Sequence, residues 1–166
     1  CGIEAARFAV LAGNFLDAGS AAALGLLTHL VDPAEVESTV TELANTGKPA
    51  NKYPASPANP SHPAASFALA FYNDANMAAL ENGECPDGFD AADKMVGRQL
   101  KSLSRTAPIA LAMASALLDD AVATGEDLNA GLALELERLY EIFGTADALE
   151  GLSALIEGRR PTYTNA

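Results

Sequence analysis

The stretch that decides the fold is Thr145 to Tyr163, TADALEGLSALIEGRRPTY, which has the pattern of a short amphipathic helix. Thr145 is suited to cap the N-terminus of this helix, and Asp147 in the first turn favours the positive end of the helix dipole. Leu155 lies beside an apolar stripe with helical spacing, which is formed by Leu149, Leu152 and Ile156. The stretch therefore predicts a helix that closes the chain.

The helix is expected to end at Gly158, and Pro161 prevents it from continuing. Arg159 and Arg160 then project from its C-terminal end. The simplest interpretation is a closing helix with a solvated basic exit.

The same residues resemble the C-terminal signature of the enoyl-CoA hydratase/isomerase (crotonase) superfamily. Members of that family close with a pattern near F-x-T-x-D-x-x-E-G-x-x-A-F-x-E-K-R-x-P-x-F. Leu155 stands at the usual Phe, Gly158 at the usual Lys and Tyr163 at the final aromatic. The matching residues are Phe143, Thr145, Asp147, Glu150, Gly151, Ala154, Glu157, Arg159 and Pro161.

A second segment, Leu11 to Val31, resembles the crotonase pattern L-T-G-x-x-x-x-A-x-E-A-x-x-x-G-L-V-x-x-V-V. Asn14, Ser20 and Leu27 replace the common Arg, Glu and Val of that pattern. The matching residues are Gly13, Ala18, Ala21, Gly25 and Leu26. The two segments occur in the family's order, at the two ends of the chain.

The resemblance implies a mainly α chain that forms the C-terminal helical part of a crotonase (ClpP/crotonase-like) fold. Residues 1–46 would be the end of the crotonase core and its following helix. Residues 47–98 would be a proline-rich loop with a helical insertion, and residues 99–166 the helical region for oligomerisation and the CoA site. At most a short strand is expected near 27–31, where the apolar run fits a buried strand or a helix end equally well.

By resemblance, the full-length protein would process acyl-CoA, and hydration of enoyl-CoA is the favoured reaction. In that family two backbone N–H groups hold the thioester carbonyl, and carboxylates supply acid/base catalysis. All of these precede the part of the family that this chain matches. The chain is therefore expected to hold no catalytic residue, to bind no metal and to be inactive alone, with coenzyme A present only as part of the substrate.

The resemblance also implies a CoA- or substrate-binding role for Leu155, Arg159 and Arg160. The arginines would face phosphate, although Gly158 stands where relatives often carry a charged Lys. The expected partners are an acyl-CoA substrate, an upstream catalytic half, and further copies in a homotrimer or a dimer of trimers.

Two alternatives remain open. The insertion, with its Phe-x-x-x-Phe-Tyr helix and the later run Leu103 to Pro108, is more similar to the CoA-thioester hydrolase branch, so hydrolysis of a thioester or of a cyclic acyl-CoA is the runner-up. A non-catalytic helical oligomerisation module is the alternative from a different class.

Composition limits which partners the protein is expected to bind and where in the cell it is expected to lie. The formal charge of −12 argues against nucleic acid or an anionic membrane as partner. No apolar run reaches the ~18–20 residues that span a bilayer. Cys1 and Cys85 have no metal-ligand spacing and fit a reducing compartment, so a cytoplasmic location is expected.

Local patterns predict the remaining helices. Asp32 and Pro33 start one helix, with a stripe expected to be buried at Val36, Val40 and Leu43. Asp90 is expected to cap the helix that ends at Leu103. His62 is interpreted as a solvated side chain in the loop at 48–63, and Glu135, Glu137 and Glu141 as a solvated helix face.

Overall fold

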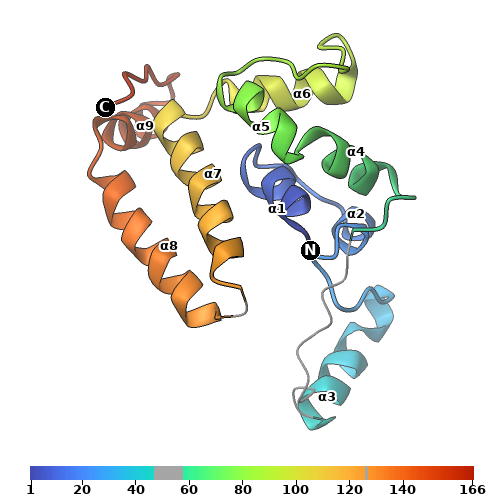
Figure 1. Ribbon diagram of the computed structural model, residues 1–166. Helices are drawn as coiled ribbons and strands as arrows, with labels where there is room; N and C mark the ends of the chain where they lie inside the picture. The colour runs from blue at the N-terminus through green and yellow to red at the C-terminus, as the bar shows by residue number, and fades with distance from the viewer. Residues whose placement is uncertain (47–57, 126) are drawn as a thin grey trace.

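The computed structural model describes residues 1–46, 58–125 and 127–166. Within them the chain is all-α, with nine α-helices, one 3-10 helix and no strand (Figure 1). The elements are α1 (Ile3–Val10), α2 (Ala18–Ala23), η1 (Pro33–Glu35), α3 (Val36–Thr46), α4 (Pro63–Phe71), α5 (Asp74–Glu81), α6 (Lys94–Leu103), α7 (Pro108–Ala123), α8 (Leu128–Phe143) and α9 (Ala146–Glu157). The expected mainly α class is confirmed. Residues 27–31, where a short strand was allowed, form neither strand nor helix.

Side-chain caps set most helix starts as the sequence indicates. Asp17, Asp127 and Thr145 each accept hydrogen bonds from backbone N–H groups in the first turn of the helix that follows. The expected cap at Asp90 is wrong, because α6 begins later. Its cap is Asp93, whose Oδ1 accepts from the backbone N–H groups of residues 95 and 96 at 2.8 and 3.1 Å.

The core is an aromatic cluster where α1 packs against α4. Phe71 and Tyr72 are fully buried. The ring of Phe8 meets the ring of Tyr72 edge-on, with centroids 5.8 Å apart, and Phe71 stacks on Phe67 at 4.9 Å. Such aromatic pairs stabilise a core beyond the area they bury.

A buried polar chain fixes α6 against this cluster. The Tyr72 hydroxyl donates to Gln99 Oε1 at 2.8 Å, and Gln99 and Asn14 exchange two side-chain hydrogen bonds of 2.9 Å. Burial raises the pKa of Tyr72 well above its usual value, so its hydroxyl stays a donor. Because all these groups are paired, the network holds α1, α4 and α6 in one register.

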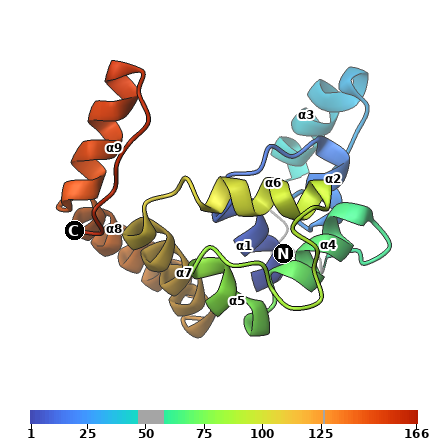
Figure 2. The same ribbon diagram turned by 90° about the horizontal axis from the view of Figure 1, so that it is seen from above.

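The C-terminal third has a different character. The helices α7 and α8 form an antiparallel pair, and α9 turns away at its end (Figures 1 and 2). No residue of α8 is buried. An apolar stripe of this helix faces solvent, made by Leu128, Leu132, Leu136, Leu139 and Phe143, each at least 47% exposed.

Helix α3 projects from the core (Figure 1) and contacts η1. The prediction of a buried stripe on α3 is wrong, because Val36 and Val40 are 48% and 60% exposed and Leu43 is half-buried. The helix itself and its start were correctly predicted from sequence, since Asp32 accepts from the Ala34 N–H at 2.9 Å. Most of the proline-rich loop at 48–63 lies outside the described residues.

Candidate functional site

The C-terminal tail folds back along α9 and is held by three carboxylates. Asp147, which is only 2% exposed, accepts from the backbone N–H groups of Thr164 and Asn165 at 2.7 and 2.9 Å. Its own backbone N–H donates to the carbonyl of Ala166 at 3.0 Å. The tail therefore supplies the partners that a buried carboxylate requires. We call the contacts between the tail and α9 the C-terminal clasp.

Arg159 is the cation of the clasp. Its two terminal nitrogens donate to the two oxygens of Glu150 at 2.6 and 2.8 Å, and its Nε donates to Glu157. Glu150 also accepts from the backbone N–H of Thr162 at 2.7 Å. The hydrogen bonds from Arg159, together with that backbone donor, lower the pKa of Glu150 to about 2. The same pairing raises the pKa of Arg159.

Two glycines make the clasp geometrically feasible. Gly158 ends α9 with a left-handed φ of 67°, which lets the Arg159 backbone N–H return to the carbonyl of Ala154 at 3.0 Å. Gly151 lies under Tyr163, because a Cβ at this position would come 3.4 Å from the Tyr163 hydroxyl. The tail can thus lie close to the helix surface.

A groove of about 430 Å³ opens beside the clasp. It is lined by Ser104, Arg105, Arg159, Arg160, Pro161 and Tyr163. Arg105 comes from the turn between α6 and α7, so the tail brings the 159–160 pair against a segment about fifty residues earlier. Among the described residues, neither Arg105 nor Arg160 forms an ion pair. We call this the arginine groove.

An apolar groove of about 460 Å³ adjoins the arginine groove and shares Arg105 and Tyr163 with it. It lies between the start of α7 and the junction of α8 and α9. Its apolar lining includes Ala107, Ala110, Ile142, Phe143 and Leu152. The two adjoining grooves therefore form one binding surface that is cationic in the arginine groove and mostly apolar in the other groove.

The sequence-predicted site residues are only partly brought together. Arg159 and Arg160 both line the arginine groove, but the Arg159 guanidinium is occupied by Glu150 and Glu157. Leu155 is 78% exposed on α9 and lines neither groove. Arg105 was missed in the sequence, because a single arginine in a short turn belongs to no recognisable pattern. Its place beside Arg159 and Arg160 depends on how the C-terminal tail folds.

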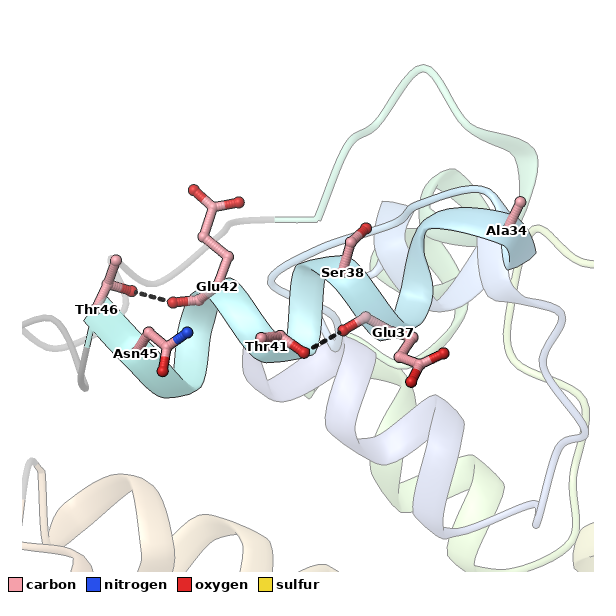
Figure 3. Close-up of a pocket in the computed structure, with 7 residues that line it drawn as sticks. All are labelled: Ala34, Glu37, Ser38, Thr41, Glu42, Asn45 and Thr46. Carbon is pink, nitrogen blue, oxygen red and sulfur yellow. Dashed lines mark hydrogen bonds between the residues drawn. The ribbon is translucent and has the colours of Figure 1, made fainter.

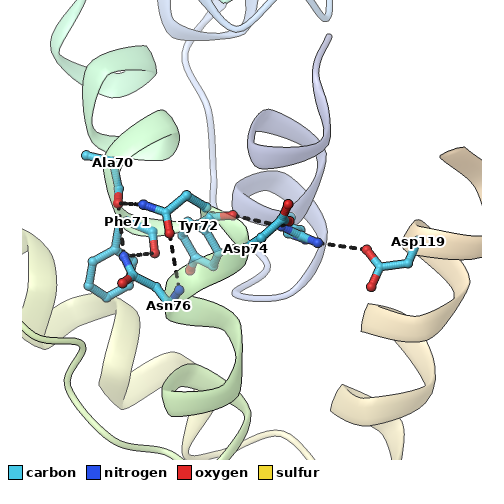
Figure 4. Close-up of polar contacts among 8 residues, drawn as sticks. Ala70, Phe71, Tyr72, Asp74, Asn76 and Asp119 are labelled. Atoms are coloured by element: carbon cyan, nitrogen blue, oxygen red, sulfur yellow. Dashed lines mark hydrogen bonds and ion pairs between the residues drawn. The ribbon is translucent and has the colours of Figure 1, made fainter.

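A second polar centre, also missed from sequence, surrounds Arg7 in α1. The Arg7 side chain is 4% exposed and donates to Asp74 and to Asp119 at 2.7 Å each (Figure 4). It also donates to the carbonyl of Tyr72 at 3.1 Å. Burial opposes the charge of Arg7, but the hydrogen bonds that it donates to the two carboxylates, together with their negative charges, outweigh this and raise the pKa of Arg7. Asp119, near the C-terminal end of α7, thereby ties α7 to α1.

Other sequence candidates have structural explanations. His62 is not simply solvated, since its Nδ1 accepts from the Ala64 N–H at 3.3 Å and caps α4. Glu141 binds Arg138 at 2.8 Å, and Arg138 also lies 3.6 Å from Asp120 of α7. The hollow beside α3 is lined by polar side chains of α3 itself and by Ala34 of η1. The two hydrogen bonds drawn there run from Thr41 and Thr46 to carbonyls of the same helix (Figure 3).

In the part of the chain that the structure covers, no group of three or more His, Cys, Asp or Glu side chains is arranged to hold a metal ion. Over the same residues, no single helix is long and apolar enough to cross a membrane. Only α6 and α7 taken together, bent by 106° at their break, have that length and composition. Comparison with protein-family models, with curated proteins and with solved structures found no match for this chain.

Proposed function

We propose that this chain is the C-terminal helical part of an acyl-CoA-processing enzyme of the crotonase superfamily, with enoyl-CoA hydration as the reaction of the full protein. The observation that supports it is the clasp. The residues that carry the family resemblance interact with one another: Thr145 caps α9, and Glu150 and Glu157 bind Arg159. The Tyr163 ring packs against Gly151, where a Cβ would lie 3.4 Å from the Tyr163 hydroxyl. Residues that match a family at fixed spacing thus form one physical unit.

In this proposal the chain contributes binding and assembly rather than chemistry. The oxyanion donors and acid/base carboxylates belong to an upstream half of the fold. The exposed apolar stripe of α8 and the exposed Leu149 and Ile156 of α9 are suited to pack against that half or against further copies in a trimer. The grooves beside the clasp would receive part of the acyl-CoA.

Hydrolysis of a CoA thioester or of a cyclic acyl-CoA is the second candidate reaction. It is favoured by the inserted helices α4 to α6 ahead of the run from Leu103 to Pro108, which is the feature that is more similar to hydrolases. A non-catalytic oligomerisation module is the candidate from another class, favoured by the exposed stripe of α8.

The test is to purify the native protein from its source cells and to assay it with crotonyl-CoA, a short enoyl-CoA. Loss of the enoyl absorbance without release of free thiol supports hydration. Release of free coenzyme A from a saturated acyl-CoA supports the hydrolase instead. If pure native protein catalyses neither reaction, the enzyme proposal is wrong and the oligomerisation module is favoured.

A further inference from the structure

We propose that Arg105 and Arg160 form a phosphate-binding site in the arginine groove, and that Arg159 only holds the tail that carries Arg160. That the bound phosphate belongs to an acyl-CoA rests on the proposed function; the phosphate site itself does not. The sequence alone suggested that the adjacent pair Arg159-Arg160 contacts phosphate. The fold instead brings Arg105 and Arg160 into one groove, and we assign the contact to these two.

The first argument is charge. The chain has 10 Lys and Arg side chains against 22 Asp and Glu. Three of those ten line this one groove. Glu150 and Glu157 neutralise Arg159, whereas no described carboxylate pairs with Arg105 or Arg160. The groove therefore keeps two uncompensated positive charges on an acidic molecule, which matches a doubly charged phosphate.

The second argument is donor geometry. A guanidinium presents several N–H donors in a planar fork that fits phosphate oxygens. Ser104 cannot compete as a donor, since its hydroxyl donates to the carbonyl of Lys101 at 3.0 Å.

The third argument is the shape of the surroundings. The arginine groove, at about 430 Å³, is larger than one phosphate requires. It continues into the apolar groove past Tyr163, which lines both. A ligand with phosphate at one end and an apolar group at the other fits this arrangement, as a nucleotide-linked acyl thioester does.

The clasp positions this site without contacting the ligand. Arg160 follows Arg159 directly, and the Thr162 N–H donates to Glu150 at 2.7 Å. The tail is thus fixed on both sides of Arg160. Because both oxygens of Glu150 are occupied by Arg159, this carboxylate does not draw the Arg160 guanidinium away from the groove.

The experiment is calorimetric titration of the full chain with pyrophosphate, a probe without an acyl group. Binding is expected at low ionic strength, weakening as sodium chloride is raised, because exposed charges are screened. Arg105→Gln and Arg160→Gln should each lower affinity roughly tenfold or more, since each removes charge-assisted hydrogen bonds. Arg138→Gln is the matched control, because this exposed arginine lies on α8 outside the groove, and it should leave affinity unchanged.

Circular dichroism of each variant shows whether it remains folded. Absence of pyrophosphate binding by the folded wild-type chain overturns the proposal. So does an Arg105→Gln variant that stays folded and binds as tightly as the wild type. This result is independent of enoyl-CoA turnover by the native protein, so the phosphate site and the proposed function can fail separately.

Discussion

The two ends of the molecule use similar apolar helices in opposite ways. In the N-terminal part, Phe8, Phe71 and Tyr72 are buried around one centre, and Gln99 completes their polar contacts. In the C-terminal part, α8 and α9 turn most of their large apolar side chains to solvent, and polar contacts of the clasp fix the tail on α9. The N-terminal part thus has a closed apolar core, while the C-terminal part exposes apolar side chains to solvent.

The difference shows that periodicity reports which face of a helix is apolar, but not what covers it. The leucine stripe of α8 has regular helical spacing, yet α8 meets α7 through a side that includes Arg138, Leu139 and Ile142, so the stripe reaches that contact only near its C-terminal end. Leu128, Leu132 and Leu136 face outward. Monomeric proteins rarely expose contiguous apolar surface of this kind, and such patches mark interaction sites.

The largest expected effect is on stability, which should depend much more on the N-terminal core than on the exposed side chains of α9. Phe71→Ala should lower the free energy of unfolding by about 3–5 kcal/mol, because it leaves a cavity in the aromatic core. Leu149→Ala on α9, where the side chain is 69% exposed, should change it by less than about 0.5 kcal/mol. Urea unfolding followed by circular dichroism measures both. Equal losses would contradict the distinction.

The next effect concerns the polar centre that joins α1, α5 and α7. Arg7→Met should cost about 2 kcal/mol, because it leaves a buried carbonyl and two carboxylates without their donor. Arg138→Met, which removes an arginine paired with Glu141 on exposed α8, should have a clearly smaller effect. Thermal unfolding of the two variants, side by side, tests this. A smaller loss for Arg7→Met than for Arg138→Met would refute the role of Arg7.

The third effect is local and depends on pH. The pKa of Glu150 is lowered from its ordinary 4.5 to about 2, so its contribution to the clasp is complete above pH 4.5 and is lost as pH falls through 2. The nuclear Overhauser effect between the Tyr163 ring and Gly151 should weaken over that range. Glu150→Gln should weaken it already at pH 7, and Glu141→Gln should not. A contact that persists in Glu150→Gln would show that the carboxylate is dispensable.

The smallest expected effect on the isolated chain is on the α8 stripe. Leu132→Ser with Leu136→Ser should leave the free energy of unfolding within about 1 kcal/mol, because both side chains are about half exposed. If the stripe is an interface, as the proposed function requires, the same double substitution should reduce self-association or assembly with the proposed upstream half. Sedimentation of wild type and variant measures it. A large stability loss without a change in assembly would mean that the stripe belongs to an internal core.

Much of the fold was predictable, since local chemistry sets helix ends. The cap Thr145 and the helix start at Asp32 and Pro33 were predicted from sequence. The start of α6 was misplaced because two aspartates, Asp90 and Asp93, both lie where a cap could stand. Burial of the α3 stripe was wrongly predicted, because a pattern does not reveal whether another element lies opposite.

Only part of the candidate site was predictable from the sequence. The adjacent pair Arg159-Arg160 was visible, but its pairing with Glu150 and the approach of Arg105 depend on how the tail folds. Arg7 was hidden for a similar reason. Its partners Asp74 and Asp119 lie far away in sequence, and an arginine on the apolar side of a helix gives no signal of what it meets.

The most direct test of the account is native mass spectrometry of the protein from its source cells. The account predicts an assembly of several copies, in which each polypeptide is well above the 17.1 kDa of this chain and covers the outward faces of α8 and α9. A stable monomer of 17.1 kDa would contradict it, because the apolar faces would then have no partner.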